Sequence, residues 1–249
     1  MRDTPAPSLN GRIALVTGAS RGIGQQCALA LAKAGAQVVA CARTQSGLEE
    51  LDDAIFAATG QHATLIPFDL VDGSAMERLG PVLYERYGKL DILVHAAAHL
   101  GSLSPVTCTD PKDFNKIISV NLTASYRLIR AVEPVLRLSD AARAVFFTSG
   151  VASSPRAFWG PYAASKAGLE AMVRCWLDEI EHTPIRGALV NPGPTKTRMR
   201  HEAYPGEDKS LLSLPEAIAP MVLEMVRTDR EPPMHTVHYR DWVGTSNTH

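Results

Sequence analysis

Short apolar runs alternate along this chain with longer amphipathic stretches, and this alternation limits the fold more than any other feature. The runs lack the polar alternation of half-buried strands, so they predict a parallel sheet that is covered on both faces. Because crossovers between parallel strands are right-handed, the pattern predicts an α/β fold, with a doubly wound sheet between two layers of helices. We predict strands at 13–17, 37–41, 63–67, 91–97, 144–149, 187–191 and 236–239, and helices at 22–34, 46–58, 73–87, 111–138 (interrupted or adjusted near Pro134), 161–180 and 215–227.

The length of 249 residues suits one domain, and we predict a single domain over 1–249. Its least regular stretch, 195–213, is longer than most loops and is a candidate lid within that domain. The 25 basic and 26 acidic residues argue against nucleic acid as a partner. No apolar run approaches the roughly 20 residues that span a bilayer, and residues 1–12 lack the apolar core of a secretory signal. We therefore expect a cytoplasmic protein with no membrane partner.

Cysteine and histidine residues are spread along the chain without the spacing of a ligand set. The four cysteines form no C-x-x-C pair, and the eight histidines form no H-E-x-x-H motif. The cysteines are predicted to be small buried apolar residues that stay reduced, rather than disulfide or zinc partners. The sequence therefore predicts no metal site. These cysteines are Cys27, Cys41, Cys108 and Cys175.

Three glycines lie between the first predicted strand and the helix that follows it. Gly18 allows a turn that a Cβ would obstruct, Gly22 lets backbone approach a pyrophosphate, and Gly24 lets helix and strand pack closely. The helix that begins here offers free N–H groups to that phosphate. A tight turn with no ligand would need similar residues, but the strand–turn–helix context favours a dinucleotide.

The spacing G-x-x-x-G-x-G resembles that of the short-chain dehydrogenase/reductase family, and the resemblance extends over 9–239. It implies a seven-stranded Rossmann sheet and a nicotinamide cofactor. It also implies that the pair Asp69-Leu70 meets the adenine ring, although an aspartate there could instead cap the next helix. Further expected cofactor-binding residues lie in the glycine turn and after the fourth strand, namely Gly18, Ser20, Arg21, Gly22, Ile23, Gly24 and Ala97.

The end of the second predicted strand indicates which dinucleotide binds. An acidic residue there would hold both ribose hydroxyls of NAD and repel a 2′-phosphate. This chain has Ala42 followed by Arg43, with Arg21 in the glycine turn nearby. Guanidinium groups match phosphate oxygens, so we predict NADP(H) rather than NAD(H). The alternative is that both arginines are solvated surface residues.

A tyrosine and a lysine are four residues apart in the helix at 161–180. Tyr162 and Lys166 therefore share one helix face. A phenol has a reference pKa of about 10, and the ammonium, together with the positive ring of an oxidised nicotinamide, is expected to favour the phenolate. Tyr162 would then act as general acid or base. By resemblance, Lys166 also holds the nicotinamide ribose, and both residues touch the cofactor.

Two more residues complete the catalytic set that the resemblance implies. Ser149 ends the fifth predicted strand and would orient the substrate oxygen; alternatively it is a turn serine. Asn121 corresponds to the asparagine that holds a water near the lysine and completes a proton relay. It could also be a buried structural amide that bends its helix, and both interpretations can hold together.

The turn after the sixth predicted strand resembles the segment that closes over the cofactor in this family. The backbone near Thr195 and the hydroxyl of Thr197 would then meet the carboxamide of nicotinamide. An ordinary Pro-Gly turn accounts for Pro192 and Gly193 alone. All four residues are predicted to bind the cofactor.

The chain departs from the family pattern in two places. Where the family has Asn-Asn-Ala-Gly after the fourth strand, this chain has His95 to Ala98, which weakens the expected cofactor affinity. We interpret His95 as a hydrogen-bonding residue at the end of the sheet rather than as a base. At the C-terminus a polar tail replaces a glycine-rich turn, so a homodimer is as consistent with the sequence as a homotetramer.

The catalytic set predicts an oxidoreductase that moves a hydride between nicotinamide and a carbonyl or secondary alcohol. The alternative is a catalytically silent NADP(H)-binding sensor or scaffold of the same fold. Arg156 and either Arg198 or Arg200 could meet an anionic group, or could be solvated. The residues expected to border a mostly apolar substrate pocket are Leu100, Arg156, Phe158, Trp159 and Met199.

Overall fold

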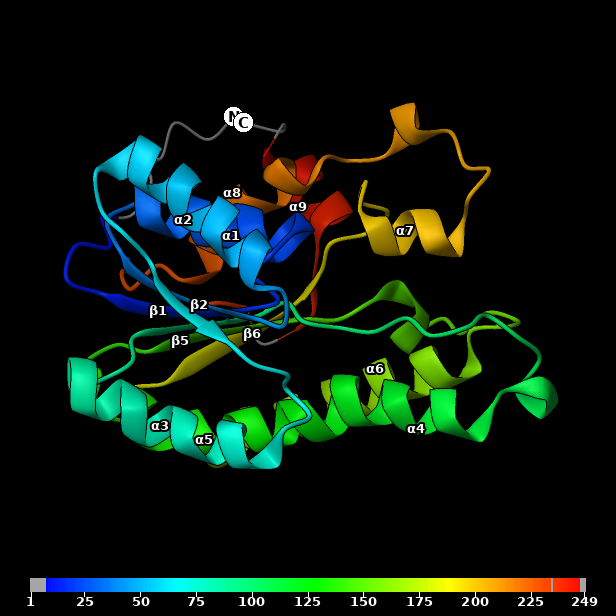
Figure 1. Cartoon of the computed structure of the whole chain (residues 1–249), viewed down its shortest axis with the longest axis horizontal. Coiled ribbons are helices and arrows are strands. Elements are labelled where there is room, and N and C mark those ends of the chain that lie inside the picture. The colour runs from blue at the N-terminus through cyan, green and yellow to red at the C-terminus, as the bar shows by residue number, and fades with distance from the viewer. Residues whose placement is uncertain (1–7, 234, 247–249) are drawn as a thin grey trace.

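A sheet of seven parallel strands forms the centre of the computed structural model, which describes residues 8–233 and 235–246 (Figure 1). The strands lie in the order β3-β2-β1-β4-β5-β6-β7, so the predicted doubly wound fold is confirmed. Residues 1–7, part of the segment predicted not to be a secretory signal, lie outside the described residues. The strands are β1 (Ile13–Thr17), β2 (Gln37–Ala42), β3 (Thr64–Pro67), β4 (Ile92–His95), β5 (Arg143–Phe147), β6 (Arg186–Asn191) and β7 (Val237–His238).

Helices cover both faces of the sheet (Figure 1). One layer holds α1 (Gly22–Lys33), α2 (Gln45–Thr59), α8 (Ala219–Met225) and α9 (Tyr239–Ser246). The opposite layer holds α3 (Gly73–Tyr87), α4 (Pro111–Ile118), α5 (Ala124–Leu136) and α6 (Gly160–Glu179). The short helix α7 (Arg198–Ala203) lies in the predicted lid segment, to one side of the first layer.

The central positions of the inner strands are apolar because both faces of the sheet are covered, and their polar residues lie at the strand ends. In β1, Ala14 and Val16 pack into the core beneath α1 and α8, while Leu15 between them packs into the core on the opposite face. This alternation follows from the two-residue period of a strand. All three side chains are fully buried. The core therefore consists of two apolar layers separated by the sheet.

Two predicted elements differ from the structure. The helix predicted at 111–138 is interrupted at Ser119–Thr123, which forms a π-helical turn, and not near Pro134, which lies inside α5. A π turn contains one more residue than an α-helical turn, and here it lies where the Asn121 amide forms hydrogen bonds with neighbouring segments. Helical periodicity in the sequence does not reveal such contacts. After β7 the chain continues as the helix α9 instead of a polar tail.

The cysteines are free, as predicted, but only Cys27 and Cys41 are buried, whereas Cys108 and Cys175 are exposed. In the part of the chain that the structure describes, no His, Cys, Asp or Glu side chains gather in a group that could hold a metal ion. None of the helices within 8–233 and 235–246 is long and apolar enough to cross a membrane.

Candidate active site

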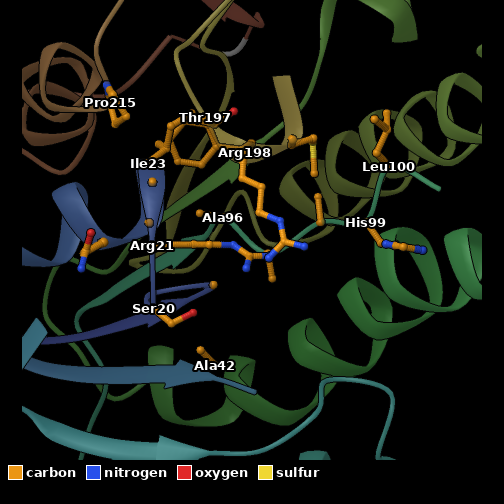
Figure 2. A pocket seen from close by; sticks show the side chains of 18 of the residues that line it. Ser20, Arg21, Ile23, Ala42, Ala96, His99, Leu100, Thr197, Arg198 and Pro215 are labelled. Atoms are coloured by element: carbon orange, nitrogen blue, oxygen red, sulfur yellow. The ribbon is translucent and has the colours of Figure 1, made fainter. Parts of the chain in front are cut away.

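A cavity of about 580 Å³ opens at the carboxyl ends of β1, β2 and β4 (Figure 2). The strand order reverses between β1 and β4, because the chain winds outward from β1 to β3 and then returns to β4. Crossover helices therefore leave the sheet in opposite directions at this point, which creates a crevice that side chains do not fill. The cavity lies where the predicted dinucleotide site should be.

The three glycines form the floor of this cavity. Gly18 has φ +69°, and a Cβ there would lie 2.8 Å from the backbone of Ala97 at the end of β4. A Cβ on Gly24 would clash with the Gly18 backbone, whereas Gly22, at φ +59°, faces the cavity with Thr197 as its nearest neighbour. No side chain caps the start of α1, so its first N–H groups remain for an anion. This cradle fits the pyrophosphate of a dinucleotide.

Most of the predicted cofactor-binding residues line the cavity. Two do not: Gly193 lines a second cavity on the other side of its turn, and Thr195 is buried within the turn. The Thr195 hydroxyl bonds the carbonyl of Pro192, and Thr195 pairs with Ser213, so the turn itself occupies its side chain. The predicted residues that line the cavity are Gly18, Ser20, Arg21, Gly22, Ile23, Gly24, Arg43, Asp69, Leu70, Ala97, Tyr162, Lys166, Pro192 and Thr197.

Guanidinium groups gather at the mouth of the cavity. Figure 2 shows Arg21 and Arg198 extending into it toward one another, while Ala42 presents no carboxylate at the end of β2. The Arg43 guanidinium nitrogen Nη1 lies 4.0 Å from the Asp69 carboxylate oxygen Oδ2, and both side chains are exposed. The alternative that Asp69 caps the next helix is wrong, because Asp72 accepts from the first N–H groups of α3. Arg198 is paired with Glu202, which also lines the cavity. Basic side chains still outnumber acidic ones around the cavity, and this excess favours an anionic ligand.

The side chains of Tyr162 and Lys166 are buried one turn apart on α6, and both line the cavity. The phenol hydroxyl donates to the Met199 sulfur at 3.8 Å, and the Lys166 ammonium donates to the carbonyl of Phe147 at 2.9 Å. Burial raises the pKa of Tyr162 to about 12, which the Ser149 hydroxyl partly opposes. Burial also lowers the pKa of Lys166 to about 8.

The direction of the tyrosine shift is opposite to the one that the sequence predicted. The prediction counted the attraction of the phenolate to the ammonium and to the ring of an oxidised nicotinamide. In this structure removal of the phenolate from water is the largest effect, and the group that opposes it is the Ser149 hydroxyl. At neutral pH the phenol therefore keeps its proton. A buried phenol with its proton is prepared to act as a general acid.

Ser149 and Asn121 lie beside this pair without lining the same cavity. Ser149 lies two residues beyond the end of β5, where its hydroxyl accepts from the backbone of Val151, and it lines the second cavity. Asn121 is fully buried in the π turn. Its amide exchanges two hydrogen bonds with the backbone of His99, at 2.8 and 2.9 Å, and donates to the Ser165 hydroxyl at 2.9 Å. These contacts agree with the interpretation of Asn121 as a buried structural amide, which is compatible with a role in a relay.

His95 joins the end of the sheet to this π turn, as the sequence predicted for a hydrogen-bonding residue. Its Nδ1 lies 2.7 Å from the Thr17 hydroxyl and its Nε2 lies 2.9 Å from the Ser125 hydroxyl, which donates to the Asn121 carbonyl at 2.8 Å. A carbonyl can only accept, so Ser125 must accept from Nε2–H and Thr17 must donate to Nδ1. Burial first, and then the charge of Lys166, lower the pKa of His95 to about 3.

The pKa of His95 predicts a loss of stability in acid. The unfolded chain binds a proton near pH 6.5 and the folded chain only near pH 3, so stability falls as the pH drops between these values. From pH 6.5 to pH 5 the loss is about 2 kcal/mol. Urea unfolding at pH 7 and pH 5 gives the decrease in the free energy of unfolding between the two pH values. This decrease should be smaller in His95→Asn than in the parent by about this amount. The exposed His182→Asn is the control, and an unchanged pH dependence in His95→Asn would contradict the assignment.

The second cavity, of about 440 Å³, lies on the other side of Ser149. Two aromatic rings form one wall, with Trp159 and Tyr204 at 5.8 Å between centroids. Of the residues expected to border the substrate, Leu100 and Met199 line the first cavity, and Arg156 and Trp159 line the second. Phe158 lines neither, because it is 56% exposed in a turn at φ +73°.

Comparison with known proteins identifies the family. Residues 12–208 match the family model described as short chain dehydrogenase. The chain belongs to the short-chain dehydrogenase family. Among the relatives of this short-chain dehydrogenase is the uncharacterized oxidoreductase YciK of Escherichia coli (strain K12), which is 36% identical over 223 residues, covering 89% of this chain and 88% of the relative.

Solved structures agree with this family assignment. A short chain dehydrogenase from Shigella flexneri 2a, complexed with NADP, is 34% identical and superposes with a TM-score of 0.91 over 95% of this chain and 100% of that one. One from Escherichia coli CFT073, complexed with NADPH, is also 34% identical, with a TM-score of 0.90 over 95% of this chain and 99% of that one. This short-chain dehydrogenase therefore has a fold that holds NADP(H) in two similar proteins.

The sequence did not point to all of the residues that line the two cavities. Helix α7 of this short-chain dehydrogenase contributes three residues that the sequence did indicate, Arg198 and Met199 to the first cavity and Arg200 to the second. His238 and Arg240, near the C-terminus, line the second cavity and were not predicted. Nothing in the spacing of these residues connects them with Ser149, because they approach it from different elements.

Proposed function

We propose that this short-chain dehydrogenase is an NADP(H)-dependent oxidoreductase that interconverts a carbonyl compound and a secondary alcohol. One observation carries the proposal: the buried phenol of Tyr162 and the ammonium of Lys166 face a glycine-floored cavity at the switch point of the sheet. NADP(H), when bound, supplies or accepts the hydride at C4 of its nicotinamide. The protein supplies or accepts the accompanying proton, and Tyr162 is the group that exchanges it with the substrate oxygen.

The residues that would hold NADP(H) are those that line the first cavity. The N–H groups at the start of α1 and the glycine turn would bind the pyrophosphate. Arg21 and Arg43 would bind the 2′-phosphate, since Ala42 leaves no carboxylate to repel it. Asp69 and Leu70 would meet the adenine, and Ala97, Pro192 and Thr197 would complete the nicotinamide end.

The protonation states favour a role for Tyr162 as the acid in carbonyl reduction. Its phenol, with a pKa raised to about 12 by burial, holds the proton that a carbonyl oxygen needs. Ser149, next to that phenol, would orient the same oxygen. Lys166 would hold the ribose and return a proton to the phenol after each reduction. Asn121, in the π turn, would hold a water that passes protons between Lys166 and the solvent. In alcohol oxidation the same groups would accept the proton.

Replacement of Arg43 by aspartate is expected to reverse the cofactor preference. The carboxylate would repel a 2′-phosphate and accept from the ribose hydroxyls, so the ratio of Kd for NADH to Kd for NADPH should fall by roughly a hundredfold, the product of two charge-dependent contacts. Fluorescence titration of both proteins with both cofactors measures this ratio. Arg86→Asp, on α3, is the control. Tighter binding of NADH than NADPH by the parent would overturn the cofactor assignment.

The alternative of a silent NADP(H)-binding sensor or scaffold has one observation in its favour. His95 to Ala98 replace the asparagines and glycine that the family has beside the ribose. Oxidation of NADPH with a panel of ketones, aldehydes and quinones separates the two functions. Turnover of any of them supports the enzyme, and NADPH binding with no turnover on the whole panel supports the sensor.

A further inference from the structure

The second cavity has a strong charge bias. Among the described residues that line it are Arg156, Arg200, Arg240 and His238, and none of these described lining residues carries a carboxylate. Arg200 and Arg240 pair with carboxylates outside the lining. We propose that this cavity binds an anionic group, a carboxylate or a phosphate, at the far end of the carbonyl substrate. The inference rests on the proposed function and names the class of substrate: an acidic aldehyde or ketone.

The position of the cavity places an anion within reach of the reacting groups. Ser149 lines the second cavity, and its hydroxyl is close enough to the phenol of Tyr162 to lower the pKa of that phenol by a hydrogen bond. Tyr162 itself lines the first cavity. The Trp159 ring lies edge-on to the Tyr162 ring, with 5.8 Å between centroids. One substrate can therefore place its carbonyl at the phenol and extend past Trp159 into the second cavity.

The wall beside Trp159 is held rigidly. Arg200 stacks on the Tyr204 ring, with its guanidinium carbon 4.1 Å from the centroid, and its Nε donates to Glu207 at 2.6 Å. Tyr204 in turn packs against Trp159. This stack gives the apolar or aromatic body of a substrate a flat surface. Because Glu207 balances the charge of Arg200, the stack itself is not the main anion receptor.

Arg156 is the guanidinium best placed for that role. Its side chain forms no hydrogen bond or ion pair with any residue within 8–233 and 235–246, whereas Arg200 is paired with Glu207 and Arg240 with Asp241. Its loop, between β5 and α6, also carries Ser149 and Trp159. An unpaired guanidinium beside the cavity has all of its donors available to a carboxylate or phosphate.

A pair of substrates that differ only in charge tests the proposal. We would compare 4-carboxybenzaldehyde with its neutral methyl ester, using NADPH as reductant, and include 4-formylphenyl phosphate as a third substrate. The parent protein should reduce at least one of the acids with a kcat/KM roughly tenfold above that of the ester, since a charge-assisted hydrogen bond has about this effect. Which acid is preferred distinguishes a carboxylate from a phosphate. Equal kcat/KM values for the ester and both acids would overturn the proposal.

Variants of Arg156 assign the preference to this residue. Arg156→Gln should lower kcat/KM for the preferred acid by roughly tenfold, mainly through KM, and lower kcat/KM for the ester much less. Arg156→Lys should retain part of the preference, because it keeps the charge but loses the fork. Arg86→Gln, far from the cavity on α3, is the matched control. An acid preference that survives unchanged in Arg156→Gln would overturn the role of Arg156.

Binding measurements separate this inference from the proposed function. Calorimetric titration with 4-(hydroxymethyl)benzoate, with 4-(hydroxymethyl)phenyl phosphate and with the methyl ester of the former needs no turnover. Tighter binding of an anion by the parent, but not by Arg156→Gln, supports the anionic cavity even if no carbonyl compound is reduced, a result that would count against the enzyme alone. Reduction of the neutral ester without any preference for an anion in rate or binding would leave the enzyme intact and reject the anionic cavity.

Discussion

The variant Tyr162→Phe is expected to lower kcat for NADPH-dependent carbonyl reduction by roughly 10²- to 10⁴-fold, the usual contribution of a general acid. The phenol is the donor that faces the cavity beside Ser149, and burial raises its pKa to about 12, so it holds a proton throughout the neutral range. Phenylalanine removes that proton and keeps the ring. Steady-state kinetics on any carbonyl compound that the parent reduces measures the effect.

Several controls make a loss of rate in this variant specific. The ring of Tyr162 is almost fully buried against Trp159, and phenylalanine preserves that packing, so thermal unfolding and NADPH binding should be retained. Tyr84→Phe, an exposed tyrosine on α3, should leave kcat unchanged. A kcat for Tyr162→Phe within twofold of the parent would remove Tyr162 from its proposed role.

Gly24→Ala is expected to lower the free energy of unfolding by about 3 kcal/mol, at the upper end of the cost of overpacking, and to abolish measurable NADPH binding. A Cβ at this position would overlap the carbonyl oxygen of Gly18 and lie 2.9 Å from its carbonyl carbon. Neither group can move easily, because Gly18 is packed so close to the end of β4 that a Cβ on it would lie 2.8 Å from the Ala97 backbone. Helix α1 must therefore shift away from the turn that it serves.

Gly206→Ala is the matched control for this variant. Gly206 has no neighbour within 4 Å of an added Cβ and no positive φ, so alanine there should not destabilise the protein. Urea unfolding and fluorescence titration with NADPH would be applied to all three proteins. A Gly24→Ala protein with the stability and NADPH affinity of the parent would show that the close packing of helix and turn is not needed.

The sequence determined the fold because parallel strands that are covered on both faces must be apolar along most of their length. The run Ile13–Thr17 and the helix after it were predicted within one residue of β1 and α1. The prediction was this close because the apolar run ends at Gly18 and the helical spacing of apolar residues begins at Gly22. Most of the residues that the order of glycines, tyrosine and lysine pointed to line one cavity. Each of these signals lies within one element or one turn.

Contacts between distant elements were decided only by the tertiary structure. The hydrogen bonds of Asn121 to His99 and Ser165 are made from a π turn that interrupts the helix at Ser119–Thr123, where the sequence predicted no interruption. The neutral His95, between Thr17 and Ser125, depends on three segments meeting in a place without water.

The electrostatics of the candidate active site and the extent of the second cavity were likewise beyond the sequence. The sequence predicted that Lys166 and an oxidised nicotinamide ring would together lower the pKa of Tyr162, whereas burial, which depends on the whole fold, raises it in this structure. The arginines of the second cavity come from a loop, from α7 and from α9. Periodicity along a chain records which face of each element is buried, whereas the solvation of a charge and the shape of a cavity depend on which elements are packed together.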